Sequence, residues 1–115
     1  MKAEQFDKIL DQQIDSIRKV LASKRAEYAP TEDDRLHNFR KAAALTGQSL
    51  AGAAFGMAMK HIVSVADIVE QADRGNTQSM EMLDEKIGDS INYLILIKAC
   101  LIEQRERALA DTEVK

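Results

Sequence analysis

The stretch Tyr93–Ile102, with the sequence YLILIKACLI, decides the fold class of this chain. It lies within a longer segment, about 78–110, in which apolar residues recur at helical spacing. The core stripe expected for this helix consists of Met80, Leu83, Ile87, Ile91, Leu94 and Leu101. Past residue 91, apolar side chains occupy nearly every face of the helix. A helix that is apolar on every side must be covered on every side. The rest of a chain of 115 residues can hardly supply that cover, so we predict a dimer or larger assembly in which Ile91, Leu94 and Leu101 are buried.

Proline and glycine divide the rest of the chain into three further helices. The first is expected over about 3–28, before Pro30, the only proline. The second follows an acidic loop in which Thr31 or Asp33 serves as N-cap, and it stops near Gly47.

A third helix is expected from residue 50 to about 73, with Ser49 as its N-cap, and Thr77 is the N-cap expected for the fourth. Gly52 and Gly56 are four residues apart in the third helix, a spacing that predicts close packing against another helix. The sequence therefore predicts one all-α, bundle-like domain over 1–115, with four helices of which two are long, ordered over about 4–110.

The composition is that of a soluble globular protein, with 45% apolar and 30% charged residues. The net charge is −3 and no Lys/Arg run exceeds two residues, so nucleic acid is not an expected partner. The single cysteine, Cys100, cannot form an internal disulfide, and we expect it to be buried in a reduced, cytosolic setting. The N-terminus has no signal-peptide core, and Lys60, His61 and Lys98 interrupt the apolar stretches, so we expect no membrane span. The expected location is the cytoplasm, of a host cell if the gene is viral.

The most informative polar residues lie on the fourth helix. Glu85, Asp89 and Asn92 follow i, i+4, i+7 spacing and share one edge of the helix, which Leu96 continues into the apolar half. Carboxylates that run toward buried surface need a cation, a basic partner or a proton. Mg²⁺ holding a polyphosphate is one candidate. The alternative is a solvated first turn, with Asp89 paired to an arginine.

The third helix carries a second polar stripe, made of Lys60, Ser64, Asp67, Gln71 and Arg74, with Glu70 beside it. Asp67 and Glu70 have the i, i+3 spacing that lets two carboxylates converge on one metal ion. The alternative is that the stripe is the solvated side of an amphipathic helix. His61 lies at the flank of this stripe, where a boundary residue is more common than a ligand.

A third polar cluster surrounds the start of the second helix. It contains Lys24, Tyr28, the turn 33–35, Asn38 and Arg40. Arg35 beside free backbone N–H groups would make a phosphate grip, or it would only neutralise Glu32 and Asp34. The sequence contains no nucleophile arrangement, P-loop or zinc-ligand spacing.

Three segments of the chain resemble a known family. They are Lys24-x-x-Glu27-Tyr28 with Asp34-Arg35-Leu36-x-Asn38-Phe39; Met59-Lys60-His61; and Glu85-Lys86-Ile87-Gly88-Asp89-x-x-Asn92-Tyr93-Leu94. Over about 20–103 the chain is similar to small phage-encoded helical proteins, and distantly to the MazG-like all-α NTP pyrophosphohydrolases. The resemblance implies a helical bundle, usually a dimer or tetramer. It also implies that acidic residues of two adjacent helices bind Mg²⁺ and cleave a nucleoside triphosphate between its α and β phosphates.

Carried over to this chain, the resemblance makes Asp67, Glu70, Glu85 and Asp89 the metal ligands. The chain departs from the family's Glu-Glu-x-x-Glu motif, because Asp67-x-x-Glu70 supplies only two acids. It also departs from the Glu-x-x-Asp motif, because Lys86 stands three residues before Asp89 and adds a positive charge where a ligand is expected.

Three hypotheses follow for function. The first is a Mg²⁺-dependent nucleotide pyrophosphohydrolase, with Lys60 and Arg35 holding phosphates. The second is a non-catalytic binder of nucleotides or of a nucleotide-derived defence signal. The third is a structural oligomer without a ligand. The residues expected to contact a nucleotide are Lys24, Tyr28, Arg35, Asn38, Lys60, His61 and Asn92.

Overall fold

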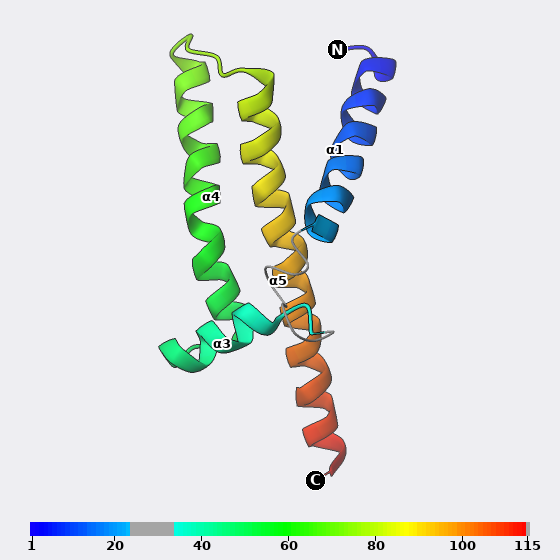
Figure 1. Ribbon diagram of the computed structural model, residues 1–115, viewed down its shortest axis with the longest axis vertical. Helices are drawn as coiled ribbons and strands as arrows, with labels where there is room; N and C mark the ends of the chain where they lie inside the picture. Colours follow the sequence, from blue (N-terminus) through cyan, green and yellow to red (C-terminus); the bar gives the residue numbers. More distant parts are fainter. Residues whose placement is uncertain (24–33, 115) are drawn as a thin grey trace.

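The computed structural model describes residues 1–23 and 34–114. Its elements in chain order are α1 (Ala3–Ser23), α3 (His37–Thr46), α4 (Leu50–Asp73) and α5 (Met80–Val114) (Figure 1). The described part of the chain contains four helices and no strand, which confirms the all-α prediction; three of the helices, not two, exceed 20 residues.

The longest helix, α5, lies between its neighbours. It runs antiparallel to α4, and the two form a hairpin joined by the turn at 74–79 (Figure 1). We refer to this end of the hairpin as the turn end. At the opposite end, the α3 end, helix α3 packs across α4. α1 contacts α5 and diverges from it toward the N-terminus, which gives a molecule of 56 × 29 × 28 Å.

The helix boundaries agree in part with the sequence. Ser49 caps α4 as expected, since its Oγ accepts a hydrogen bond from the Gly52 N–H at 3.0 Å. Gly47 ends α3 in the left-handed conformation, with φ of 66°, a backbone state that glycine adopts without strain. The cap of α5 is Ser79, whose Oγ accepts from the Met82 N–H at 3.1 Å, so the expectation of Thr77 is wrong. The reason is that α5 begins at Met80, later than the sequence suggested.

The start of α3 also differs from the expectation. The helix begins at His37, and Asp34 Oδ1 accepts a hydrogen bond from the Leu36 N–H at 3.1 Å just before it. The Asp34 carboxylate therefore orders the turn that leads into α3. The expected caps, Thr31 and Asp33, lie outside the described residues.

The core lies at the α3 end of the hairpin. Phe39 and Cys100 are the largest fully buried side chains, and they cluster with Leu36, Ala51, Ala54 and Leu96. The burial of Cys100 confirms that prediction, and burial raises the pKa of its thiol. Small alanine side chains on α4 let its neighbours approach closely in this region.

The glycine pair of α4 does not make the expected close helix contact. Gly56 is exposed, and a Cβ added there would meet nothing within 4 Å. A Cβ at Gly52 would meet only the local cap, Ser49 Oγ at 2.9 Å and the side chain of Gln48. The prediction of helix packing across these glycines is therefore wrong within the chain, because α4 turns its alanine face to its neighbours instead.

The inner face of α5 is not the stripe that the sequence indicated. The residues buried against the rest of the chain are Gly88, Asn92, Leu96 and Cys100, each four apart. Leu94 and Leu101, which the sequence placed in the core stripe, are 56% and 53% exposed. A helix that is apolar on several sides offers more than one candidate core face, and α4 covers only one of them. Burial of Leu94 and Leu101 in an assembly stays a prediction.

The composition of α4 bears on the membrane expectation. It is the one helix in the described part of the chain that is long and apolar enough to cross a membrane by these two criteria. The statement that charged residues keep every apolar stretch too short for a span therefore does not hold for α4. Core helices of soluble proteins meet the same criteria, and α4 packs against both α3 and α5, so this is weak support for a membrane location.

Candidate functional site

A line of polar side chains and two cavities follows one side of the α4–α5 hairpin, and we name this surface the α4–α5 groove. The α4 wall is the polar stripe noted in the sequence. Lys60 lines one of the two cavities, and Ser64, Asp67 and Gln71 line the other. The α5 wall is formed by Met82, Lys86 and Tyr93. The spacing of these residues places them along one face of each helix. The stripe on α4 therefore faces the neighbouring helix along a groove.

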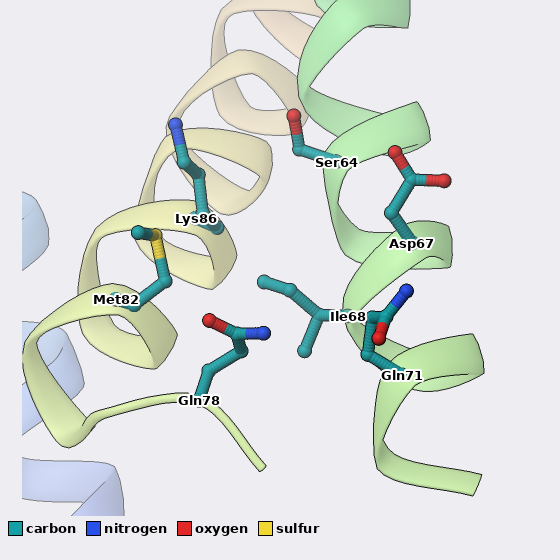
Figure 2. A pocket seen from close by; sticks show the side chains of 7 residues that line it. All are labelled: Ser64, Asp67, Ile68, Gln71, Gln78, Met82 and Lys86. Carbon is teal, nitrogen blue, oxygen red and sulfur yellow. The ribbon is translucent and has the colours of Figure 1, made fainter. Parts of the chain in front are cut away.

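The cavity nearer the turn end has a volume of about 210 Å³, and we name it the Asp67 cavity (Figure 2). Its lining residues are Ser64, Asp67, Ile68, Gln71, Gln78, Met82 and Lys86. Asp67 and Lys86 extend from facing helices with opposite charges. Lys86 Nζ also lies 4.0 Å from Glu85 Oε1. This cavity therefore already contains its own cation.

The second cavity has a volume of about 340 Å³ and is lined by Gly56, Met57, Lys60 and Tyr93. We name it the Lys60 cavity. The missing side chain of Gly56 leaves one wall open, which is a role for this glycine that the helix-packing interpretation overlooked. An ammonium group and an aromatic ring therefore line the same space, and these two groups can bind an anionic ligand that carries a planar ring.

His61 and Asp89 connect the two helices next to this cavity. The His61 ring stacks on Tyr93, with the ring centroids 4.8 Å apart and an interplanar angle of 27°. His61 Nδ1 lies 3.6 Å from Asp89 Oδ2, a charged pair when the imidazole is protonated. The partner of Asp89 shown here is thus a histidine, where the alternative sequence interpretation expected an arginine. The structure brings four sequence-noted residues together, namely Lys60, His61, Asp89 and Tyr93.

The four expected metal ligands are distributed differently. Asp67 lines the cavity that contains Lys86, and Asp89 pairs with His61. Glu70 is exposed, and the Glu85 side chain is 62% exposed beside Lys86. Among residues 1–23 and 34–114 no group of three or more Asp, Glu, His or Cys side chains is placed to hold a metal ion. The described donor set does not fit Mg²⁺, and a magnesium site stays a prediction from the resemblance.

Asn92 lies on the inner face of α5. It is only 7% exposed, and its Oδ1 atom has no hydrogen-bond partner. A buried acceptor without a donor costs about 1–3 kcal/mol of stability. Asn92 is not among the residues that line either cavity, so the prediction that it contacts a ligand gains no geometric support.

The third polar cluster of the sequence lies away from the groove. Lys24 and Tyr28 fall outside the described residues. Arg35 donates from Nη2 to the Leu21 carbonyl oxygen at 2.7 Å, and so ties the end of α1 to the turn before α3. Its Nε atom is buried without a partner. Asn38 is half-buried on α3. Neither Arg35 nor Asn38 lines a groove cavity, so the phosphate grip expected of them is not part of this site.

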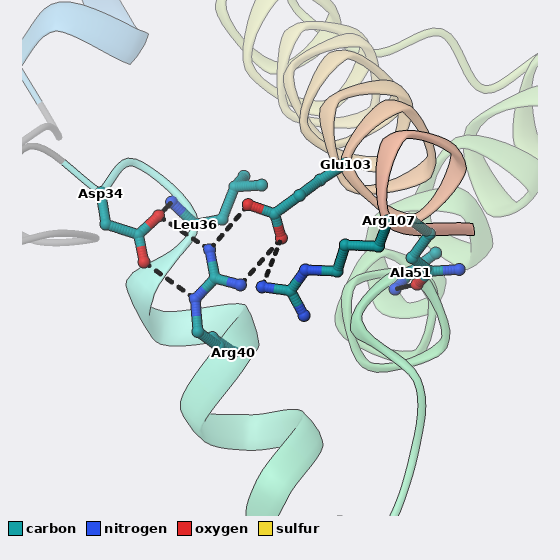
Figure 3. A network of polar contacts seen from close by, with 7 residues as sticks. Asp34, Leu36, Arg40, Ala51, Glu103 and Arg107 are labelled. Atoms are coloured by element: carbon teal, nitrogen blue, oxygen red, sulfur yellow. Dashed lines mark hydrogen bonds and ion pairs between the residues drawn. The ribbon is translucent and has the colours of Figure 1, made fainter. Parts of the chain in front are cut away.

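Arg40 and Asp34 of this cluster form a charged network at the α3 end with Glu103 and Arg107, two residues of α5 that the sequence did not connect to them (Figure 3). Arg40 donates from Nε to Asp34 Oδ2 at 2.9 Å and from Nη1 to Glu103 Oε2 at 2.8 Å, and its Nη2 donates to the second oxygen of each carboxylate at 3.0 Å. Arg107 adds a contact to Glu103 at 3.7 Å. The hydrogen bonds from Arg40 lower the pKa of Asp34 and of Glu103, and those carboxylates in turn raise the pKa of Arg40.

The network fastens α3 to α5 and has a structural role. The next residue, Gln104, links α5 to α4 in the same region. Its Oε1 accepts a hydrogen bond from the Ala51 N–H at 2.7 Å and so satisfies one free amide at the start of α4. No local sequence pattern indicates the contact between Arg40 and Glu103, because the two residues are 63 positions apart.

Comparisons of the chain with protein-family models, curated proteins and solved structures give no match. The resemblance to MazG-like pyrophosphohydrolases therefore stays a prediction, and the arguments for function rest on the groove itself.

Proposed function

We propose that this protein binds a nucleotide or nucleotide-derived small molecule in the α4–α5 groove, and that this binding needs no metal ion. The observation that carries the proposal is the Lys60 cavity, in which an ammonium group and the Tyr93 ring line one space of about 340 Å³. That volume lies within the range of small-molecule sites, about 300–1,000 Å³.

The two ends of such a ligand have different requirements, and the groove offers a group for each. A phosphate needs positive charge, which Lys60 supplies in this cavity and Lys86 supplies in the next. A base or sugar needs an apolar or aromatic surface, which Tyr93 and Met57 supply. Lys86 and Tyr93 are seven residues apart on α5, or about 10 Å along the helix axis, so an extended ligand could contact both cavities.

Metal-dependent nucleotide hydrolysis is the second candidate. It is favoured by one observation, that α4 supplies Asp67 to the Asp67 cavity and α5 supplies Asp89, which pairs with His61 next to the Lys60 cavity. Lys86, which lines the same cavity as Asp67, provides positive charge without an ion, which favours direct binding of the anion. The two candidates differ in their response to a chelator.

The test is a thermal-shift titration with a panel of nucleotides, in EDTA and in Mg²⁺, with turnover followed in the same samples. Binding to the folded state raises the melting temperature by mass action. We expect one nucleotide class to give the same shift in both buffers. A shift and turnover that both require Mg²⁺ would favour the hydrolase, and no shift with any nucleotide would contradict both candidates.

Two variants localise the site. Gly56→Leu should fill the Lys60 cavity and abolish the shift while the chain stays folded, because leucine is a better helix former than glycine and meets nothing within 4 Å at Cβ. Lys60→Ala should weaken binding by about tenfold, since it removes one charge-assisted contact worth about 1.5 kcal/mol. The matched control is Lys41→Ala, which removes an exposed lysine of α3 outside the groove and should leave the shift unchanged.

A further inference from the structure

The single chain exposes more surface than a folded protein of its size normally does. Its accessible surface is 8449 Å² for 12.8 kDa. A monomer of that mass has about 6,300 Å², so the excess is roughly 2,000 Å². The radius of gyration, 17.2 Å, also exceeds the value of about 13 Å expected for a compact chain of this length. A stable protein interface covers about 800 Å² or more on each partner, and obligate dimers cover more than that.

Five of the exposed large apolar side chains lie on one side of α5. We name this surface the open face of α5 and define it by Leu94, Ile95, Leu101, Ile102 and Leu109, which are 43–56% exposed. Leu94 and Leu101 are seven residues apart, and Ile95, Ile102 and Leu109 repeat at the same interval. An apolar repeat of seven residues along a helix is typical of a surface that packs against another helix over its length.

The open face and the α4–α5 groove are on different sides of α5. Helical geometry turns Leu94 and Leu101 away from Tyr93 and Cys100, which face α4 and the core. A partner on the open face would therefore leave the groove accessible, and a role for this face is independent of the proposed function.

We infer that a second copy of this chain covers the open face, with α5 of one protomer packed along α5 of its partner about a two-fold axis. The excess surface matches what an obligate interface buries, and the copy supplies the same seven-residue repeat that the face requires. Lys98 and Arg105 lie between the two apolar rows of this face, four residues after Leu94 and Leu101, and they would be costly to place in the hydrocarbon of a bilayer.

Sedimentation equilibrium on the full chain tests this inference. We expect the wild-type protein to be a dimer at micromolar concentration. Leu94→Asp should weaken association by at least a hundredfold with unchanged helical content by circular dichroism, because Leu94 is exposed in the single chain. The matched control is Val69→Asp on α4, which changes a side chain of nearly the same exposure, 54%, and should leave the dimer intact.

A second measurement needs no variant. The melting temperature of a dimer rises with protein concentration, so we expect a clear increase for the wild-type protein over a hundredfold concentration range. A compact wild-type monomer with a concentration-independent melting temperature would overturn the inference. Dissociation by Val69→Asp as well as by Leu94→Asp would do the same, as would a monomer that co-sediments with phosphatidylcholine vesicles.

Discussion

The two ends of the α4–α5 hairpin are built from the same pair of helices but differ in how they pack. At the α3 end, Phe39, Leu96 and Cys100 form a buried cluster and Arg40 fastens α3 to α5. Toward the turn end, polar side chains replace the apolar ones and the Asp67 cavity opens between the helices. The α3 end therefore supplies most of the buried apolar packing, whereas the rest of the hairpin, where we propose that a ligand binds, is less completely packed.

The largest expected effect comes from truncating one apolar side chain at each end. Leu96→Ala removes a 6% exposed side chain from the core, which should cost about 2–5 kcal/mol of unfolding free energy. Ile68→Ala removes a side chain of the same size that faces the Asp67 cavity and is only half-buried, and it should cost roughly 1 kcal/mol. Urea unfolding of both variants at one fixed protein concentration measures the difference. Equal losses would show that the two ends contribute alike to stability.

The sequence was sufficient to predict which segments form helices, but not which face of α5 is buried. Helical spacing, Ser49 and Gly47 were sufficient to predict α4 and the end of α3, because caps and periodicity are local properties. The inner face of α5 could not be read in the same way. Apolar residues surround the helix after residue 91, and only the position of α4 selects the side that contains Leu96 and Cys100.

The candidate site was predictable to a similar degree. The polar stripe of α4 and the acidic edge of α5 were visible as spacing, and the structure places Lys60, His61 and Asp89 together. The cavity at Gly56 was not visible, because a glycine in a helix indicates close packing and open space equally well. Contacts between residues distant in sequence, such as Arg40 with Glu103, leave no periodic signal.

The second expected effect concerns the charged network at the α3 end. Arg40→Met should cost about 1–2 kcal/mol at neutral pH, since the side chains are about a third exposed and solvent screens part of their attraction. The network also gives the wild-type protein a pH dependence. Arg40 lowers the pKa of Asp34 and Glu103 below their ordinary values of 3.8 and 4.5 in the folded state.

A lowered folded-state pKa stabilises the protein above the unfolded pKa, and this stability is lost as the pH falls through the lowered value. We therefore expect the urea midpoint of the wild-type protein to be constant above about pH 5.5 and to fall in the acid range, from roughly pH 4.5 downward. Arg40→Met should show a shallower acid decline, because the ion pairs that cause it are already absent. An identical acid decline in both proteins would show that other groups control the stability at low pH.

The smallest expected effect concerns Lys86 at the turn end. The Lys86→Glu substitution introduces an acidic residue three positions before Asp89, the spacing of the MazG-like motif, and it removes the cation from the Asp67 cavity. Without metal, the added carboxylate should repel Asp67 and Glu85, but this cost should stay below about 1 kcal/mol at a partly exposed site. Mg²⁺ should then raise the melting temperature of the variant and not that of the wild-type protein, since oxygen ligands would now outnumber the cations around them. With a dissociation constant near 1 mM, about 10 mM Mg²⁺ would stabilise the folded state by about 1.4 kcal/mol, an upper bound for the stabilisation.

The matched control is Lys41→Glu, which makes the same charge change on α3 outside the groove and should give no Mg²⁺ response. A Mg²⁺ response in the wild-type protein that Asp89→Asn abolishes would instead support a metal site in the unaltered groove, and would favour hydrolysis over metal-free binding.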